Sequence, residues 1–441
     1  MTAHLKLRFS IAALAFATVV PFASAQRTAN AANDMHWVAT WGASEQQPRA
    51  AGPGRGGAAP QAAAAPAGNA AAPAPAPAAP PAPPRAAPPP SAFNNQTVRM
   101  IVRTSLGGSR VRVHLSNAFG TTPLAVGAAH IALRSKDSAI VAGSDRALAF
   151  HGKPSVTIPP GAEMISDAVN LDVPKLSDLA ISVYVPGDTG PASAHSMALK
   201  TTYIQSGDST SAAEMTEATT SQAWPWVSDV DVLAPAAAGA IVAFGDSITD
   251  GATSTPNTNH SWPSLLAQRL AANPATANLA VVNQGISGNR VLGDGAGVSA
   301  LARFDRDVLA QAGVKYLMIL ESINDINGGA RQGTVTADAL IGALAQMVDR
   351  AHTHGIKVIG CTLTPYGNIN DEGEAMRLAV NAWIRTPGNF DAMVDFDAVI
   401  RDPQDPKQFK QGYNNTDKLH PNDAGYQAMA DAIDLKLFSQ K

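Results

Sequence analysis

The chain has 441 residues, of which 45% are hydrophobic and 15% charged, and its formal net charge is −3 at pH 7. Its basic residues are scattered, which argues against an electrostatic nucleic-acid binder, so we expect no nucleic-acid partner. The single cysteine, Cys361, excludes intrachain disulfides, and its largely apolar surroundings predict a small buried side chain rather than a catalytic thiol.

Residues 1–25 have the pattern of an export signal. Lys6 and Arg8 precede an apolar stretch over 9–20, and the small residues at 23–25 resemble a cleavage site. A signal anchor would need a longer apolar run, and no later segment is apolar enough to span a bilayer. We therefore expect a secreted or periplasmic protein with no integral membrane segment in the mature chain.

A low-complexity segment follows a short folded one. Residues 26–48 are expected to form an N-terminal segment with one strand, near 36–41. Residues 49–92 are almost entirely Ala, Pro and Gly, which cannot bury enough apolar area to offset chain entropy. We expect 49–92 to be a disordered insertion that interrupts the folded part, either as a tether or as a loop without a role.

Residues 93–234 are predicted to form an antiparallel β domain. Short β-rich segments separated by turn residues occur at 98–104, 110–116, 123–133 and 179–185. The first two, joined at Gly107 and Gly108, predict a hairpin with one solvent-facing side. Regularly spaced short strands without convincing helices favour a β-sandwich or jelly roll.

The pattern changes in the last segment, 235–441. Apolar strands are expected at 239–245, 279–285, 315–321, 356–363 and 391–397, in alternation with helices at 261–272, 299–312, 336–352, 374–385 and 424–438. Continuous apolar strands that alternate with helices predict a parallel sheet covered on both faces. This segment is therefore predicted to be an α/β domain.

A candidate nucleophile lies at the end of the first of these strands. The apolar run 239–245 stops at Gly245-Asp246-Ser247, and the chain then turns away toward a helix. Such a turn places a hydroxyl at the carboxyl end of the sheet, where open α/β folds bind their ligands. A second Gly-Asp-Ser ends at Ser209, before a polar stretch with no good helix, and is predicted to be a turn.

A serine hydroxyl needs a base, and the base needs a group that fixes its tautomer. Asp417 and His420 offer both within one turn, between the last strand and the final helix. His260, shortly after the nucleophile's loop, is the rival base. Asp349 and His352 have the same spacing as the first pair but lie in an amphipathic helix, which predicts a solvated face.

Two other strand ends could donate hydrogen bonds to a developing oxyanion. The loop after the second strand contains Gly288, whose backbone N–H can approach a substrate, and the loop after the third contains Asn324, with a side-chain amide. Asp246 and Asp250 are expected to brace the loops, and Arg290 to pair with a loop carboxylate.

Other charged groups receive structural interpretations. The helical segment 303–307 is predicted to be a charged exposed face. His114, His130, His151 and His195 lack metal-ligand spacing, and the chain has no His-Glu-x-x-His pair, so we predict no metal and no cofactor.

Four sequence blocks carry the candidate residues: those of Ser247, of Gly288, of Asn324, and of Asp417 with His420. In this order over 240–437, they resemble the SGNH hydrolases, also called GDSL-type esterases and lipases. The resemblance implies a flavodoxin-like three-layer α/β/α domain that hydrolyses carboxylic esters without a cofactor. It implies these roles: Ser247 as nucleophile, His420 as general base, Asp417 as its orienting partner, and an oxyanion hole from the Ser247 and Gly288 backbone N–H groups and the Asn324 side chain.

One residue departs from the family pattern. Ser322 stands two residues before Asn324, where the family usually has glycine. Glycine permits backbone angles that serine disfavours, so the loop that carries Asn324 is expected to be shaped differently.

The sequence therefore predicts a secreted serine esterase that acts through an acyl-enzyme intermediate on short-chain acyl, aryl or lipid esters. An alternative is a carbohydrate esterase that removes acetyl groups from polysaccharides, so the expected partner is a small-molecule or polysaccharide ester. An alternative of another class is a non-catalytic glycan-binding protein on a hydrolase fold. Trp224 and Trp226, near the domain junction, are predicted to be core or interface residues rather than a sugar-binding face.

Overall fold

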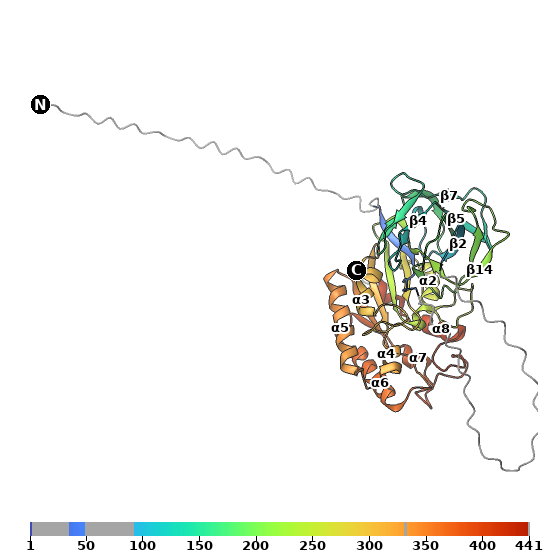
Figure 1. The fold of residues 1–441 in the computed structure, drawn as a ribbon. Helices are drawn as coiled ribbons and strands as arrows, with labels where there is room; N and C mark the ends of the chain where they lie inside the picture. Colours follow the sequence, from blue (N-terminus) through green and yellow to red (C-terminus); the bar gives the residue numbers. More distant parts are fainter. Residues whose placement is uncertain (2–34, 49–91, 330–332, 440–441) are drawn as a thin grey trace, which may run out of the picture.

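The computed structural model of the protein describes residues 1, 35–48, 92–329 and 333–439. Along the chain, an antiparallel β region precedes an α/β region with a parallel sheet (Figure 1). Apart from Met1 and Ala92, the predicted export signal and the Pro/Ala-rich insertion lie outside the described residues. No helix in the described part of the chain has the length and apolar character needed to cross a membrane.

The first antiparallel sheet joins strands that are far apart in the sequence. Its order is β1 (Met35–Gly42), β16 (Val227–Pro235), β3 (Gly108–Ser116) and β10 (Val169–Val173), with β9 (Glu163–Ile165) also paired to β3. Because β1 pairs with β16, the short segment before the Pro/Ala-rich stretch completes a sheet whose other strands come after it.

The second antiparallel sheet shares an apolar core with the first. Its order is β14 (Thr219–Ser221), β13 (Thr202–Ser206), β2 (Gln96–Arg103), β11 (Asp178–Val185), β5 (Ala128–Lys136) and β6 (Ala139–Ile140), with β7 (Arg146–Ala147) also on β5. Two strand pairs remain, β4 (Leu124–Val126) with β8 (Val156–Ile158) and β12 (Ala194–His195) with β15 (Trp224–Pro225). Val113 of the first sheet and Ile181 of the second belong to one buried cluster. The predicted antiparallel β domain is confirmed.

The predicted hairpin between 98–104 and 110–116 is wrong. Strands β2 and β3 lie in different sheets, and the link between them crosses over, where the Ser105 N–H donates to the Thr40 carbonyl at 3.0 Å. Strand β2 has six consecutive buried residues, as a central strand does, whereas β3 alternates over much of its length. A short glycine-containing link between two β-rich segments fits either a hairpin or a change of sheet, so local sequence could not decide.

The parallel sheet has five strands close to the predicted positions. Their order is β18 (Leu279–Gly285), β17 (Gly239–Gly245), β19 (Val314–Leu320), β20 (Lys357–Cys361) and β21 (Ala392–Val394). Counted along the chain this is 2-1-3-4-5, the order of flavodoxin-like doubly wound sheets. The predicted parallel sheet is confirmed.

Helices of the α/β region fall into two groups (Figure 1). This follows from the strand order, because right-handed connections that run in opposite directions along the sheet place their helices on opposite faces. In one, α5 (Ala337–Thr353) packs on α6 (Asp371–Arg385) and on α3 (Ala300–Phe304), which continues as a π-helical turn, η1 (Asp305–Leu309). In the other, α8 (Asp423–Asp431) packs on α2 (Trp262–Ala272) and α7 (Phe396–Ile400). Three further elements are α1 (Ser247–Asp250), α4 (Ile323–Gly329) and the 3-10 turn η2 (Leu435–Phe438).

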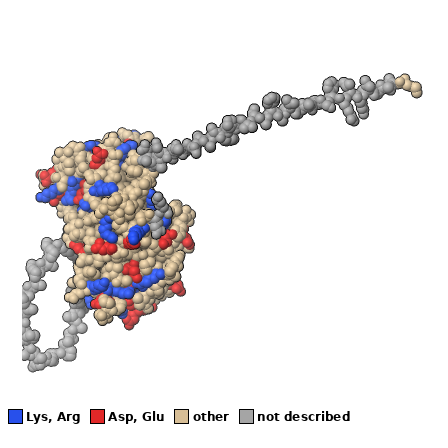
Figure 2. All heavy atoms as spheres, turned by 180° about the vertical axis from the view of Figure 1, so that it is seen from behind, with Lys and Arg blue, Asp and Glu red and all other residues tan. Residues whose placement is uncertain are grey.

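The antiparallel region packs directly against the edge of the parallel sheet. Strand β1 lies beside β18, and the Ala39 N–H donates to the Ala312 carbonyl at 2.9 Å. Ala280 and Val282 of β18 join the apolar core of the antiparallel region. On the face shown in Figure 2, acidic and basic side chains are interspersed, so this face offers no surface of a single charge.

Candidate active site

Ser247 begins α1 shortly after β17, which lies between β18 and β19 in the parallel sheet. The Asp246 carboxylate caps the helix by accepting the Ile248 N–H at 2.9 Å, and Gly251, at φ 101°, ends it after one turn. Burial raises the pKa of Asp246 above its usual value, and this hydrogen bond opposes the shift. The side chain of Asp246 is therefore committed to the turn, as the sequence predicted.

The structure brings Ser247, His420 and Asp417 into one hydrogen-bonded row. Ser247 Oγ lies 2.8 Å from His420 Nε2, and His420 Nδ1 lies 2.6 Å from Asp417 Oδ2. The other oxygen of Asp417 accepts the backbone N–H groups of Leu419 and His420 at 3.0 and 3.1 Å.

These contacts fix the protonation of the row. Burial acts to raise the pKa of Asp417, but the hydrogen bonds from His420 and the two backbone N–H groups outweigh it and hold the pKa below its usual value. An ionised Asp417 keeps the proton of the imidazole on Nδ1, so Nε2 is free to accept the proton of the Ser247 hydroxyl.

The three candidate oxyanion donors lie at the carboxyl ends of adjacent strands β17, β18 and β19. Among the described residues, the N–H groups of Ser247 and Gly288 have no hydrogen-bond acceptor. Gly288 has φ 82°, and a Cβ there would lie 3.0 Å from the Cβ of Ala296. Both the backbone conformation and the limited space therefore favour glycine at this position. Asn324 Nδ2 donates to the Asn289 carbonyl at 2.9 Å and keeps a second N–H for another acceptor.

Ser322 does not change the shape of the loop, contrary to the expectation from the sequence. Its φ is 115°, in the region that favours glycine, and its buried Oγ has no partner among the described residues. The loop that carries Asn324 therefore keeps a backbone shape suited to glycine, with serine under strain.

Behind the site, Arg303 corrects a prediction. The segment 303–307 was expected to be an exposed charged face, but Arg303 and Asp307 are 1% and 3% exposed. Arg303 donates to the Gly245 carbonyl at 2.9 Å and the Gln284 carbonyl at 2.8 Å, which ties together the ends of β17 and β18. Its spacing of four residues from Asp307 places both on the inner face of the helix, where they pair at 3.0 Å.

Sequence reasoning missed a link from the antiparallel region to the oxyanion loop. His195, which is 3% exposed, contacts Asp250 Oδ1 through Nε2 at 3.0 Å and the Ser44 carbonyl through Nδ1 at 2.9 Å. The other oxygen of Asp250 accepts the N–H and Oγ–H of Ser287 at 2.9 and 2.7 Å, one residue before Gly288. Asp250 braces the loop as predicted, but only tertiary structure could reveal its partner.

The other candidate histidines pair with carboxylates away from Ser247. His260 Nδ1 lies 3.0 Å from Asp423, and His352 Nε2 lies 2.8 Å from Asp391. Arg290 is exposed, and the expected ion pair with a loop carboxylate is absent among the described residues. Cys361 is buried, and burial raises its pKa above the usual range of a thiol.

Solved structures offer distant similarities. The chain is similar to a lipolytic protein of the G-D-S-L family from Desulfitobacterium hafniense, with 24% identity, a TM-score of 0.35, and coverage of 44% of this chain and 96% of that one. A GDSL-like lipase from Bacteroides thetaiotaomicron has 22% identity, a TM-score of 0.34 and coverages of 45% and 87%. An acetylxylan esterase from Geobacillus stearothermophilus has 23% identity, a TM-score of 0.36 and coverages of 46% and 95%.

The family comparison is more direct. The chain matches no curated protein. Residues 241–433 match the model of the GDSL-like lipase/acylhydrolase family, and this range spans all four blocks, which hold Ser247, Gly288, Asn324, and Asp417 with His420. Residues 241–433 are thus similar to the GDSL-like lipase/acylhydrolase family, in agreement with the resemblance to SGNH hydrolases.

Proposed function

We propose that the protein is an exported serine esterase that hydrolyses carboxylic esters through an acyl-enzyme intermediate. The observation that carries this proposal is the pair of contacts from Ser247 Oγ to His420 Nε2 at 2.8 Å and from His420 Nδ1 to Asp417 at 2.6 Å. A nucleophile within hydrogen-bond reach of a base, and a base oriented by a third group, is the arrangement that activates a serine. The export signal expected at 1–25 supports a secreted or periplasmic location.

In the proposed reaction, Ser247 Oγ attacks the ester carbonyl while its proton moves to His420 Nε2. The N–H groups of Ser247 and Gly288 and the amide of Asn324 donate to the oxyanion. Collapse of the tetrahedral intermediate breaks the bond to the alcohol, which takes the proton from His420. Water then attacks the acyl-serine with His420 as base, and the acid leaves. Asp417 stabilises the imidazolium in both halves of the reaction.

We assign no sugar-binding face to the antiparallel region. Trp224 and Trp226 are 9% and 0% exposed, as their predicted core role requires, and no aromatic side chain of the described residues is exposed. We therefore favour simple acyl esters over acetylated polysaccharides as substrates, with polysaccharide deacetylation as an outcome of the test.

The experiment is active-site labelling followed by a substrate panel. The purified mature protein is treated with a fluorophosphonate, and intact mass and peptide mapping locate the adduct. Hydrolysis of p-nitrophenyl acetate, butyrate and palmitate is then compared with acetate release from acetylated xylan. One adduct on Ser247 with hydrolysis of an ester supports the proposal. A folded protein that takes up no label and cleaves none of these esters contradicts it and favours the glycan-binding alternative.

A further inference from the structure

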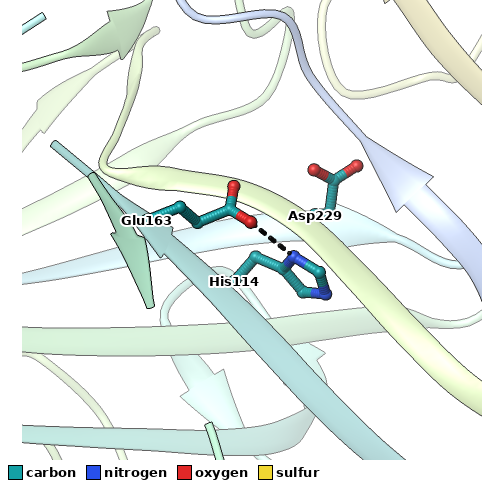
Figure 3. A group of neighbouring side chains, drawn as sticks. All are labelled: His114, Glu163 and Asp229. Atoms are coloured by element: carbon teal, nitrogen blue, oxygen red, sulfur yellow. Dashed lines mark hydrogen bonds and ion pairs between the residues drawn. The ribbon is translucent and has the colours of Figure 1, made fainter. Parts of the chain in front are cut away.

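A histidine and two carboxylates converge on neighbouring strands of the first antiparallel sheet (Figure 3). His114 lies on β3, Glu163 on β9 and Asp229 on β16, and Asp229 is the cross-strand partner of His114. One potential ligand atom from each side chain lies within 4.8 Å of the others. Local sequence patterns did not reveal this group, because 49 positions separate His114 from Glu163 and 66 separate Glu163 from Asp229.

Two of the three side chains are held by outer partners. His114 Nε2 lies 3.0 Å from Asp231 Oδ2, and Arg112 fixes the same carboxylate at 2.7 Å. The Nε2–H therefore donates to Asp231, and Nδ1 faces Glu163 at 3.0 Å. The second oxygen of Glu163 accepts the Ser228 hydroxyl at 2.8 Å. A carboxylate behind the imidazole and a donor behind the ligating carboxylate are the outer contacts that orient metal ligands.

Buried oxygens without partners lie in the same place. Asp229 Oδ1, Glu45 Oε1 and Gln311 Oε1 have no hydrogen-bond partner among the described residues, and these side chains are 8%, 2% and 7% exposed. All three residues line a cavity of about 420 Å³ between the antiparallel sheet and the segment after α3. A buried acceptor left without a partner is costly, so the cavity favours a ligand that binds oxygen.

The charge of the cavity has the right sign for a cation. Its two arginines already pair with other carboxylates, Arg112 with Asp231 at 2.7 Å and Arg306 with Asp307 at 2.6 Å. The cavity is also lined by the carboxyl groups of Glu45, Glu163 and Asp229, so acidic side chains outnumber the arginines around it.

We propose that His114 Nδ1, Glu163 and Asp229 bind a divalent cation of the zinc class between the antiparallel region and the α/β region. One imidazole nitrogen with carboxylate oxygens suits Zn²⁺, whereas Ca²⁺ prefers oxygen ligands alone. On binding, the metal replaces the proton on Nδ1 of His114, which is released to solvent. No candidate active-site residue lines this cavity, so the proposal is independent of the esterase assignment.

The test is zinc binding by the tag-free, chelator-dialysed full chain, measured by titration calorimetry and by metal content after gel filtration. We expect one equivalent of Zn²⁺ to bind with an increase in Tm, and Ca²⁺ to bind more weakly. Asp229→Asn and Glu163→Gln should each weaken zinc binding by about tenfold or more, because each removes one anionic ligand while keeping the shape of the side chain.

The matched control is Asp145→Asn, in the same domain. Asp145 pairs with His130 at 2.9 Å and is not part of the three-residue group, so this variant should bind zinc like the parent. The proposal is overturned if the parent binds no zinc, or if Asp229→Asn and Glu163→Gln, shown to be folded by circular dichroism, retain the full affinity. Zinc that both variants retain would lie elsewhere in the chain.

Discussion

The tripeptide Gly-Asp-Ser occurs twice in this chain, and the two copies share one local hydrogen bond. Asp246 accepts the N–H of Ile248 at 2.9 Å, and Asp208 accepts the N–H of Thr210 at 3.0 Å. In both copies, the aspartate caps the backbone two residues further on. This cap of the aspartate therefore does not distinguish the two serines.

The surroundings do distinguish them. Ser247 follows β17, which is buried along its whole length in the parallel sheet, and it meets the imidazole of His420. Ser209 follows β13 of an antiparallel sheet, and its Oγ accepts the side-chain N–H of Gln205 at 2.9 Å. A nucleophile thus requires the strand that precedes the turn and a base from a distant segment, and the turn itself supplies neither.

The largest expected effect separates the two serines directly. Ser247→Ala should lower kcat/KM for p-nitrophenyl acetate by at least about ten-thousand-fold, because the attacking atom is lost. Ser209→Ala should leave the rate unchanged. Steady-state kinetics on both variants measure this, and an equal loss in the two would refute the distinction.

The next test concerns the base that Ser247 has and Ser209 lacks. Asp417→Asn should lower kcat on the order of a thousand-fold, because the imidazole loses the charge that fixes its tautomer. Asp349→Asn is the matched control, since Asp349 and His352 have the same spacing in α5. If both substitutions have the same effect on kcat, Asp417 does not orient His420.

A smaller effect is expected from the contact between His195, in the antiparallel region, and Asp250, in the α/β region. His195→Gln should lower kcat about ten- to a hundred-fold, with a smaller change in KM, because Asp250 then holds the Ser287–Gly288 loop less firmly. His130→Gln, at a histidine bound only to Asp145 among the described side chains, should leave kcat unchanged. A rise in KM alone would show that His195 affects substrate binding instead.

The smallest effect concerns backbone strain near each serine. Ser322→Gly should raise the free energy of unfolding by about 1 kcal/mol, since it relieves a positive φ and removes a buried unpartnered hydroxyl. Gly207→Ala, at φ 73° with open space around the added Cβ, should lower it by about 1 kcal/mol. Urea unfolding of both variants measures the difference, and a loss of stability in Ser322→Gly would show that the serine is not strained.

Much of the α/β region could be predicted because its strands are continuous apolar runs with helices between them. The order of blocks along 239–420 also follows from the sheet, since each loop leaves the carboxyl end of a strand. The parallel sheet is confirmed, and the family model matches 241–433, as the resemblance implied. The roles of Ser247, His420 and Asp417 stay predictions.

What the sequence did not reveal depends on contacts between distant segments. The separate sheets of β2 and β3, the inward direction of Arg303 and the contact between His195 and Asp250 all arise from packing between segments that are distant in the sequence. Local periodicity describes which face of an element is apolar, but it does not identify the partner of that face. The histidine spacing that argued against a metal likewise concerned neighbours in sequence only.

The pairing of β1 with β16 also has a consequence for how the chain folds. Strand β1 precedes all other strands of the antiparallel region along the chain, yet its partner follows almost the entire region. Until β16 (Val227–Pro235) has been synthesised, β1 has no strand with which to pair. The surface of the antiparallel region that packs against β18 is then incomplete. Folding that depends on such distant contacts is slow. We expect the two regions to become stable together, late in folding, rather than one after the other.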